Sequence, residues 1–516
     1  MSHQDAINHL RSQRDTAHAG GGEARIEAQH GKGKLTARER IEEFVDPGSF
    51  VEHQTYIRGR SEEFGLGNKR NPGDGVVTGS AKVGGRQIWL AAQDFTVLGG
   101  SLGEMHARRI ADAQVMAMET GSPFIAINDS GGARIQEGIL SLEGYGEIFR
   151  NNTLASGVIP QISVILGPCA GGAVYSPAIT DFVCMVGGVS NMFITGPDVI
   201  RAVTGEEISQ EDLGGADAHA SKSGVAHCNF ADEQSGFAFL RKLLGYLPSN
   251  NREQPPIVES DDPTDRSTAL LLEIIPEDEK RAYDMTAVVG QVLDQDSFLE
   301  VHAQFARNIV VGLGKLAGRT VGVIANQPLH LAAVLDIDAA DKAARFVRFC
   351  DAFNVPILSF VDVPGFLPGV GQEHGGIIRH GAKLLFAIAE ATVPKIALIV
   401  RKAYGGAFIS MSSKALGYDR VLALPIAQIA VMGAEGAANV VFRRDIKESD
   451  DPEQTRKEKI SEFRETVMDP FIAAGLGYVD DIVNPADCRI EIIRSMEIMA
   501  RKREDRPYKK HGNIPL

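Results

Sequence analysis

The sequence predicts an α/β protein built from two tandem copies of one domain. In each half, two apolar runs typical of buried strands break at glycine-containing turns. Asp129 and Asp362, which stand at the first such break of each half, lie 233 residues apart, and Gly172 and Gly406, at the second, lie 234 apart. Four landmark pairs keep this spacing within five residues, which indicates an internal duplication.

Composition and charge set limits on the class of protein. The chain has 516 residues, 44% apolar and 23% charged, as in soluble globular proteins. Its net charge of −14 argues against nucleic acid and anionic membranes as partners. No apolar run reaches the roughly 20 residues of a membrane span, and residues 1–10 lack the apolar core of a signal peptide. The five cysteines have no metal-binding spacing. We therefore expect a cytoplasmic protein with buried, reduced thiols and no metal.

The N-terminal half is expected to begin with helices and to continue with strands. Residues 4–18 predict a polar helix, and Thr36 is placed to cap another. The basic stretch 31–40 is open to two interpretations, a solvated charged face or a clamp for a phosphate-bearing ligand. Residues 75–94 alternate as strands do, and a helix then runs to about Thr120.

Beyond this point strands alternate with helices in both halves. That order predicts right-handed crossovers and a largely parallel core sheet. Residues 249–267 are rich in proline, aspartate and asparagine, which is typical of an interdomain linker. We therefore place an N-terminal domain at residues 1–257 and a C-terminal domain at residues 268–516.

Two corners of the N-terminal half carry the chemistry that the residues themselves suggest. One follows the strand predicted at 159–166 and contains Gly171 and Gly172; the other contains Gly131 and Gly132. Glycines between a strand and a helix leave main-chain N–H groups free at the helix entrance, where two of them can hold a thioester or urea oxyanion. The alternative is that these glycines only let helices pack on strands.

Longer motifs carry a resemblance to a known family. They are Asp129–Gly138, Gly167–Pro177, Gly365–Gly369, Gly376–Lys383 and Lys510–Leu516. In these motifs, and over essentially its whole length, the chain resembles the carboxyltransferase (β) subunits of biotin-dependent acyl-CoA carboxylases, of the propionyl-CoA carboxylase type. The resemblance implies a crotonase-like (ClpP/crotonase) fold in each half. It also implies a homohexamer, with active sites where the N-terminal half of one subunit meets the C-terminal half of another.

The resemblance also implies a role for each corner. The N-terminal copy is expected to hold the acyl-CoA and the C-terminal copy to face the ureido oxygen of carboxybiotin. The residues expected on the acyl-CoA side are Gly132, Ala133, Arg134, Gly171 and Gly172. Those expected on the biotin side are Gly365, Phe366, Gly406 and Ala407. No side-chain base is then required, because the biotin ring nitrogen can take the α-proton.

Partners and substrate follow from the same resemblance. The chain lacks an alanine-methionine-lysine-methionine biotinylation site and a nucleotide-binding loop, so biotin should arrive on a separate biotin carboxylase or carrier (α) subunit. We expect propionyl-CoA to be carboxylated to methylmalonyl-CoA. Acetyl- or butyryl-CoA, a transcarboxylase and a methylmalonyl-CoA decarboxylase subunit are the alternatives that use the same site. Asp419 is expected near the acyl pocket, and Leu424 either widens that pocket or belongs to the core. From other classes, a crotonase-like hydratase or a scaffold is the remaining possibility.

Overall fold

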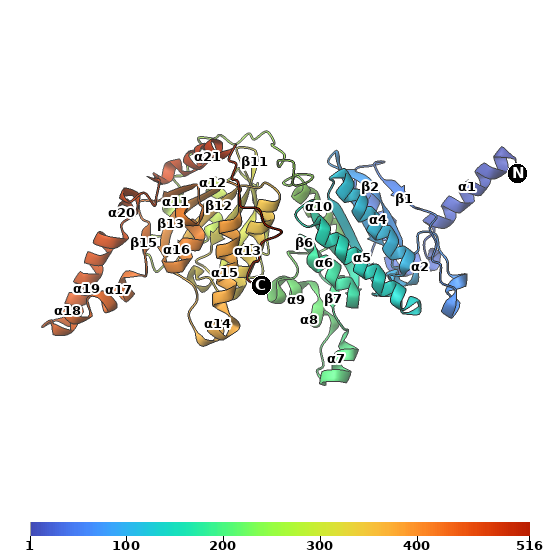
Figure 1. The fold of residues 1–516 in the computed structure, drawn as a ribbon, viewed down its shortest axis with the longest axis horizontal. Coiled ribbons are helices and arrows are strands. Elements are labelled where there is room, and N and C mark those ends of the chain that lie inside the picture. Colours follow the sequence, from blue (N-terminus) through green and yellow to red (C-terminus); the bar gives the residue numbers. More distant parts are fainter. Residues whose placement is uncertain (1) are drawn as a thin grey trace. The chain divides into compact units, whose positions relative to one another are not determined.

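The computed structural model describes residues 2–516. It divides into two compact units, Met1–Gln254 and Pro255–Leu516, and each unit is built on an eight-stranded sheet (Figure 1). The division between the units falls inside the stretch 249–267 that the composition marks as a linker.

Unit 1 has the strand order β1-β2-β3-β4-β5-β6-β8, with β7 paired to β5. Its strands are β1 Val51–His53, β2 Val76–Val83, β3 Arg86–Gln93, β4 Phe124–Ser130, β5 Gln161–Ala170, β6 Phe182–Val186, β7 Asn191–Phe193 and β8 Cys228–Phe230. The first three strands are antiparallel, and the pairs from β3 onward are parallel, which confirms the largely parallel core.

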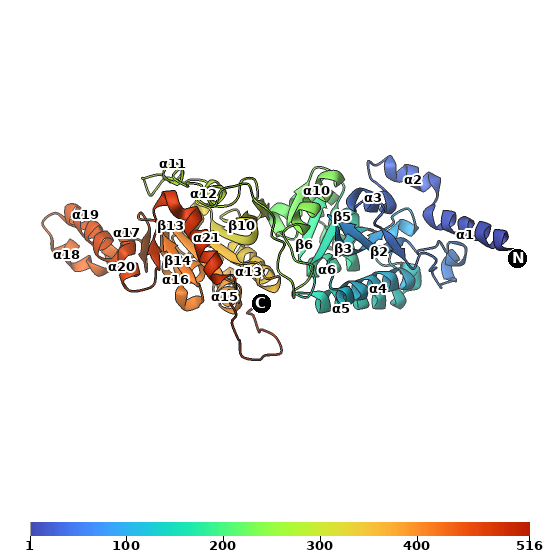
Figure 2. The ribbon, with the colours of Figure 1, turned by 90° about the horizontal axis from the view of Figure 1, so that it is seen from above.

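Helices cover both faces of this sheet. In unit 1 they are α1 His3–His18, α2 Glu23–His30, α3 Ala37–Phe44, α4 Glu104–Thr120, α5 Ile139–Ala155, α6 Tyr175–Ile179, α7 Pro197–Thr204, α8 Gln210–Gly214, α9 Ala216–Ala218 and α10 Glu233–Leu244, with the 3₁₀ turn η4 at Gly171–Val174. Helices α4 and α5 cover one face, and α3 and α10 the other (Figure 2). The predicted helices at 4–18 and up to Thr120 are confirmed. Thr36 caps α3 in a capping box with Glu39, also as predicted.

Unit 2 repeats the topology as β16-β14-β13-β12-β11-β10-β9, with β15 paired to β13. Its strands are β9 Leu299–Val301, β10 Ile309–Leu316, β11 Arg319–Asn326, β12 Ile357–Val363, β13 Lys395–Tyr404, β14 Arg420–Ala423, β15 Gln428–Ala430 and β16 Asp481–Ile482. Its helices are α11 Leu271–Ile274, α12 Met285–Val292, α13 Ile337–Ala352, α14 Val370–Gly375, α15 Ile377–Glu390, α16 Gly405–Ser412, α17 Ala434–Val441, α18 Arg443–Glu448, α19 Pro452–Phe463, α20 Pro470–Gly475 and α21 Cys488–Met499.

The two sheets match strand for strand. β2, β3 and β4 each begin 233 residues before β10, β11 and β12, and the matched strands have equal lengths. The predicted fold class, two tandem copies of one α/β domain, is therefore confirmed. What the sequence did not reveal is the antiparallel β1-β2-β3 edge and its counterpart β9-β10-β11.

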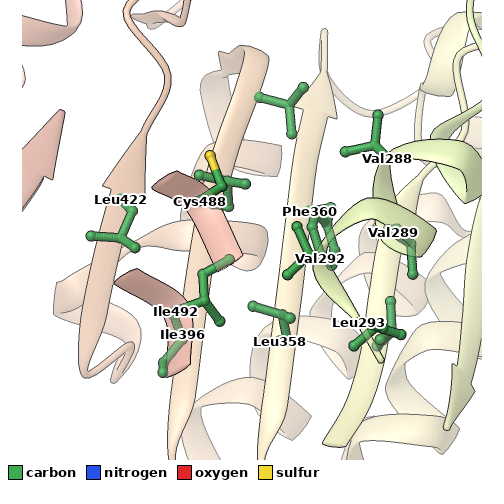
Figure 3. Packing of buried hydrophobic residues seen from close by; sticks show 14 of the residues in the cluster. Val288, Val289, Val292, Leu293, Leu358, Phe360, Ile396, Leu422, Cys488 and Ile492 are labelled. Carbon is green, nitrogen blue, oxygen red and sulfur yellow. The ribbon is translucent and has the colours of Figure 1, made fainter. Parts of the chain in front are cut away.

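The core of unit 2 lies between its sheet and the helices α12 and α21. In this cluster Val292 of α12 lies beside Phe360 of β12, and Ile492 of α21 lies beside Ile396 of β13 (Figure 3). Leu424 is buried in the same cluster, so the core interpretation of that residue is confirmed. Within residues 2–516 no helix is long and apolar enough to cross a membrane.

Candidate active site

The first corner lies where β4 and β5 of unit 1 leave the sheet. The two strands pair in parallel, so their carboxyl ends lie at the same edge of the sheet, where both segments turn away from it. The pairing shifts register between Asn128 and Ser130, where Asp129 alone faces three residues of β5, 166–168, which form a bulge just before the turn. Gly132 and Gly171 have φ angles of +98° and +62°, a backbone region that glycine adopts without strain. The geometry of the turn therefore requires glycine at both positions.

Each arm of this corner presents a main-chain N–H that has no hydrogen-bond partner among residues 2–516. Leu102 forms a parallel bridge with Ala133 and donates to the Gly132 carbonyl at 2.9 Å. Leu102 also accepts from the Arg134 N–H at 2.9 Å, and this pattern turns the Ala133 N–H away from the bridge. On the other arm, Gly172 lies in the first turn of η4, which has no side-chain cap. The two N–H groups are the donor pair that an oxyanion hole needs.

The second corner repeats this arrangement at the ends of β12 and β13 in unit 2. Leu335 bridges Phe366 and donates to the Gly365 carbonyl at 3.0 Å, which turns the Phe366 N–H outward. Gly365 and Gly405 have φ angles of +144° and +58°. Helix α16 begins at Gly405 without a side-chain cap, so the N–H of the exposed Gly406 is a first-turn donor.

The eight residues predicted for the two holes lie at these two corners, four in each unit. They are Gly132, Ala133, Gly171 and Gly172 in unit 1 and Gly365, Phe366, Gly406 and Ala407 in unit 2. The corners differ in one respect, because the chain of unit 1 enters a 3₁₀ turn while that of unit 2 enters an α-helix. What these residues contact in a complex stays a prediction.

A buried ion cluster supports the first corner, and sequence reasoning missed it. Asp129, opposite the bulge of β5, is fully buried. Its carboxylate lies 2.7 Å from the Lys34 ammonium and 2.9 Å from the Arg40 guanidinium, and it accepts from the Gln29 amide at 3.0 Å. Burial lowers the pKa of Lys34, while Asp129 opposes this shift. The residues Lys34 and Arg40 belong to the basic stretch 31–40, and they neither face solvent nor stay free for a phosphate.

In unit 2, Asp362 occupies the position that Asp129 has in unit 1, but its partners are different. Asp362 is buried, accepts from the Arg401 Nε at 3.0 Å and from the Tyr283 hydroxyl at 2.9 Å, and also accepts from the Lys402 N–H at 3.1 Å. These partners have no counterparts in the basic stretch of unit 1. The signal that could have pointed to the cluster is the 233-residue spacing between Asp129 and Asp362, which places a carboxylate at the same turn of both copies.

Arg134, predicted on the substrate side, is buried in a polar network. Its guanidinium donates to Asp74 and to Glu137 at 2.8 Å each, and to the Ser101 carbonyl at 2.9 Å. Asp74 in turn accepts from the His106 N–H at 3.0 Å. Because its donors are used within the unit, these contacts favour a positioning role for Arg134 beside the Ala133 arm.

Lowering the pH is expected to destabilise unit 1 through His106. Burial, with a further contribution from the Arg134 guanidinium, lowers the pKa of His106 to about 3. An unfolded histidine titrates near 6.5, so below that pH the unfolded state takes up a proton that the folded state does not accept until about pH 3. The stability contributed by neutral His106 is therefore lost as the pH falls, by at most about 1.4 kcal/mol per pH unit.

Urea unfolding followed by the fluorescence of Trp89, the one tryptophan of the chain, measures this loss in unit 1. His106→Gln is expected to flatten the dependence of stability on pH between about pH 6.5 and 4. An unchanged slope in this variant would assign the acid lability to the neighbouring carboxylates instead.

Asp419 lies away from the corner of its own unit. It directly precedes β14, accepts from the Lys395 N–H at 2.8 Å at the start of β13, and pairs with Lys502 at 2.9 Å. Gly406 lies beyond the other end of β13, and a ten-residue strand spans roughly 30 Å. The structure thus brings Asp419 to the C-terminal segment and not to Gly406 of the same unit.

The chain contains two copies of an α/β domain, and each copy has a pair of amide donors at one edge of its sheet. These features define a crotonase-like protein. The model of the carboxyl transferase domain family matches residues 28–514. The chain is 55% identical over 516 residues to the propionyl-CoA carboxylase carboxyltransferase subunit of Haloferax mediterranei, covering 100% of both chains. It is 52% identical to the methylmalonyl-CoA decarboxylase subunit alpha of Veillonella parvula, covering 99% of both.

A solved structure agrees with these relatives. The transcarboxylase 12S hexamer with methylmalonyl-CoA and methylmalonic acid bound superposes with a TM-score of 0.98 at 49% identity, covering 100% of this chain and 99% of that one. The chain therefore belongs to the carboxyl transferase family. The resemblance that its motifs indicated is confirmed, and so is its assignment to the carboxyltransferase enzymes.

Proposed function

We propose that this chain is the carboxyltransferase subunit of a biotin-dependent acyl-CoA carboxylase and that it carboxylates propionyl-CoA to methylmalonyl-CoA. The observation that carries the proposal is the pair of corners, each with two free amide donors, at matching positions of the two units. Relatives with the propionyl-CoA carboxylase name, at 50–55% identity, support the substrate.

The first corner is proposed to bind the acyl-CoA. The N–H groups of Ala133 and Gly172 would hold the thioester oxygen as the α-proton leaves and negative charge builds on it. Each such donor is typically worth about 3–4 kcal/mol of transition-state stabilisation. The carbon–carbon π electrons of this enolate then form the bond between the α-carbon and CO2, and the electron pair on oxygen restores the thioester carbonyl. No metal is needed in this scheme, because main-chain dipoles carry the charge.

The second corner is proposed to bind the ureido oxygen of carboxybiotin through the N–H groups of Phe366 and Gly406. Carboxybiotin, when bound, supplies the CO2 and a ring nitrogen that accepts the α-proton. The exposure of Gly406 fits a site that a carrier-borne group must reach from outside. We assign the acyl-CoA side to residues 1–257 and the biotin side to residues 268–516.

A hexamer is proposed as the working assembly, with each site formed by the N-terminal half of one subunit and the C-terminal half of another. The hexamer of the solved transcarboxylase 12S relative supports this. The biotin would come on a separate carrier or biotin carboxylase subunit. We also propose a cytoplasmic location, because all five cysteines are free and buried, as suits a reducing compartment.

The opposite direction of transfer is the second candidate. Relatives named as a methylmalonyl-CoA decarboxylase subunit and as a methylmalonyl-CoA carboxyltransferase 12S subunit are 52% and 50% identical. The same two corners serve either direction, because carboxyl transfer is reversible. The protein that co-purifies with the chain decides between the two: a biotin carboxylase supports carboxylation, and a membrane-bound decarboxylase complex supports the reverse.

Incorporation of labelled bicarbonate tests the proposal directly. The full chain, a biotin carboxylase with its biotinylated carrier, ATP and bicarbonate are incubated with acetyl-, propionyl- and butyryl-CoA. We expect the label in an acid-stable product to be highest with propionyl-CoA and to depend on the carrier. Label that stays flat across all three acyl-CoAs, with a carrier shown to be carboxylated, would reject the proposed function.

A further inference from the structure

Unit 2 has a segment after its second corner for which unit 1 has no counterpart. Six positions separate Ala133 from Ile139, where α5 begins, whereas eleven separate Phe366 from Ile377, where α15 begins. The second copy is therefore five residues longer directly after the Phe366 arm. The extra length folds as α14, which projects from unit 2 where α15 begins (Figure 1).

Helix α14 is loosely attached to the rest of unit 2. None of its six residues is buried. Its Gln372 Oε1 accepts from the N–H of Ile337, the first residue of α13, at 3.1 Å. The shorter connection of unit 1 is fixed more firmly, because Glu137 is buried, pairs with Arg134 at 2.8 Å and accepts from the Glu104 N–H at 2.6 Å. The difference points to a movable segment in unit 2.

Glycines flank α14 on both sides. Gly369 and Gly376 have φ angles of +140° and +88°, and a Cβ atom built at Gly369 meets no heavy atom within 4 Å. Gly369 follows Phe366 by three residues, which span at most about 10 Å. Gly376 precedes Gly381 by five residues, about 7.5 Å of helix, and a Cβ atom built at Gly381 lies 3.0 Å from the Phe366 ring. Both ends of α14 therefore stay beside the second corner in any orientation of the helix.

The structure shows the second corner uncovered. Phe366 has Leu335, its bridge partner, on the β11 side and Gly406 on the β13 side. The hydrogen bond of Gln372 holds α14 at the start of α13, two residues beyond Leu335, and so on the β11 side. Gly406, on the opposite side, is exposed.

We propose that α14 is a lid that turns about Gly369 and Gly376 and closes over the second corner when the ureido group is bound there. The inference rests on the proposed function and adds a closing step to it. A six-residue helix is about 9 Å long, enough to pass from the Phe366 arm toward Gly406. Val370, the one large apolar residue of α14, is 71% exposed in the open position and would be covered on closing.

Closure serves the transfer because CO2 must reach the enolate before it is lost to water. When the bond between the ureido nitrogen and the carboxyl carbon breaks, CO2 either joins the α-carbon of the enolate or escapes. In the second case the ureido nitrogen takes a proton from water, and the carboxyl group is wasted. A lid over the corner retains the CO2 and excludes the water.

The reactivity of an introduced thiol tests the closure without any turnover. All five native cysteines are buried, so Val370→Cys supplies the accessible thiol in the full chain. At a d-biotin concentration that calorimetry shows to be saturating, we expect alkylation of this thiol by iodoacetamide to slow by about 5-fold or more. Ile378→Cys is the matched control, because Ile378 is 78% exposed but lies beyond the Gly376 hinge. Equal rates with and without d-biotin at residue 370, or equal slowing at both sites, would overturn the lid.

A deletion variant tests the purpose of the lid. Removing residues 370–374 gives this connection the length that it has in unit 1. The variant is mixed with propionyl-CoA and a carrier that has been loaded with labelled carboxybiotin. We expect the ratio of label in methylmalonyl-CoA to label lost as CO2 to fall by about 10-fold. The Kd for propionyl-CoA should not change, because the first corner is intact, and this binding also confirms that the variant is folded.

Gln372→Ala provides a second test that does not depend on the deletion. Loss of one hydrogen bond should shift the lid toward its closed position by about 2–10-fold, which raises the KM for the carrier without lowering kcat. Gln372→Glu keeps the acceptor and should restore the KM. An unchanged label ratio in the deletion variant, or an unchanged KM in Gln372→Ala, would overturn the lid. A wild-type chain that transfers no label from a loaded carrier to any acyl-CoA would instead overturn the proposed function.

Discussion

Replacing Gly406 by proline is expected to lower kcat by about 10²–10³-fold. Proline removes one N–H, the donor that the second corner is proposed to offer to the ureido oxygen. The first turn of a helix tolerates proline, because the N–H groups there have no intrahelical partner. A Cβ atom built at Gly406 lies 3.7 Å from the Phe366 ring, an ordinary contact. Steady-state carboxylation, with circular dichroism to confirm the helix content, measures the effect.

Gly406→Ala is the matched control for this variant. Alanine adds the same Cβ atom but keeps the N–H, so we expect it to retain most of the activity. A loss in the alanine variant as large as that in the proline variant would mean that crowding at the corner, and not the missing donor, lowers the rate. Full activity in the proline variant would remove Gly406 from the proposed hole.

The turns could be predicted from the sequence because their backbone requires particular residues. Gly171 and Gly405 adopt left-handed φ angles, and glycine is the residue that does so without strain. The duplication could be predicted because it leaves landmarks such as Asp129 and Asp362 at a constant spacing. Thr36 could be assigned as a cap because its hydrogen bonds are to residues nearby in the chain.

The buried charged residues next to the first corner, the short strand β1 and the contacts of Asp419 could not be predicted in this way. Lys34 and Arg40 look like surface charges within their own stretch, since only the fold brings them to Asp129, 95 and 89 residues away. The antiparallel strand β1 is three residues long, too short for a periodic signal. Asp419 also depends on tertiary context, because its partner Lys502 lies 83 residues further along the chain.

Replacing Asp129 by asparagine is expected to destabilise unit 1 by about 3–5 kcal/mol, the usual result of leaving buried charges without a counter-ion. Arg40 would keep its ion pair with Glu233 at 2.7 Å, but Lys34 would lose the one carboxylate to which it is paired among residues 2–516. Because Asp129 lies opposite the bulge of β5 and four residues before Ala133 in the chain, kcat should fall as well. Denaturant unfolding followed by Trp89 fluorescence reports on unit 1 separately from unit 2.

Asp198→Asn tests whether the burial of Asp129 is the cause of the large loss of stability expected for Asp129→Asn. Asp198 also pairs with an arginine, Arg201, at 3.2 Å, but its side chain is 95% exposed, so its loss should cost less than about 1 kcal/mol. Adding Lys34→Met to the Asp129 variant removes one of the stranded charges and should restore part of the stability, because a neutral buried side chain needs no counter-ion. If Asp129→Asn unfolds at the same denaturant concentration as Asp198→Asn, the cluster does not hold the bulge in place. The Ala133 arm must then owe its position to the bridge with Leu102 and to its bonds with Gly99 and Gly100.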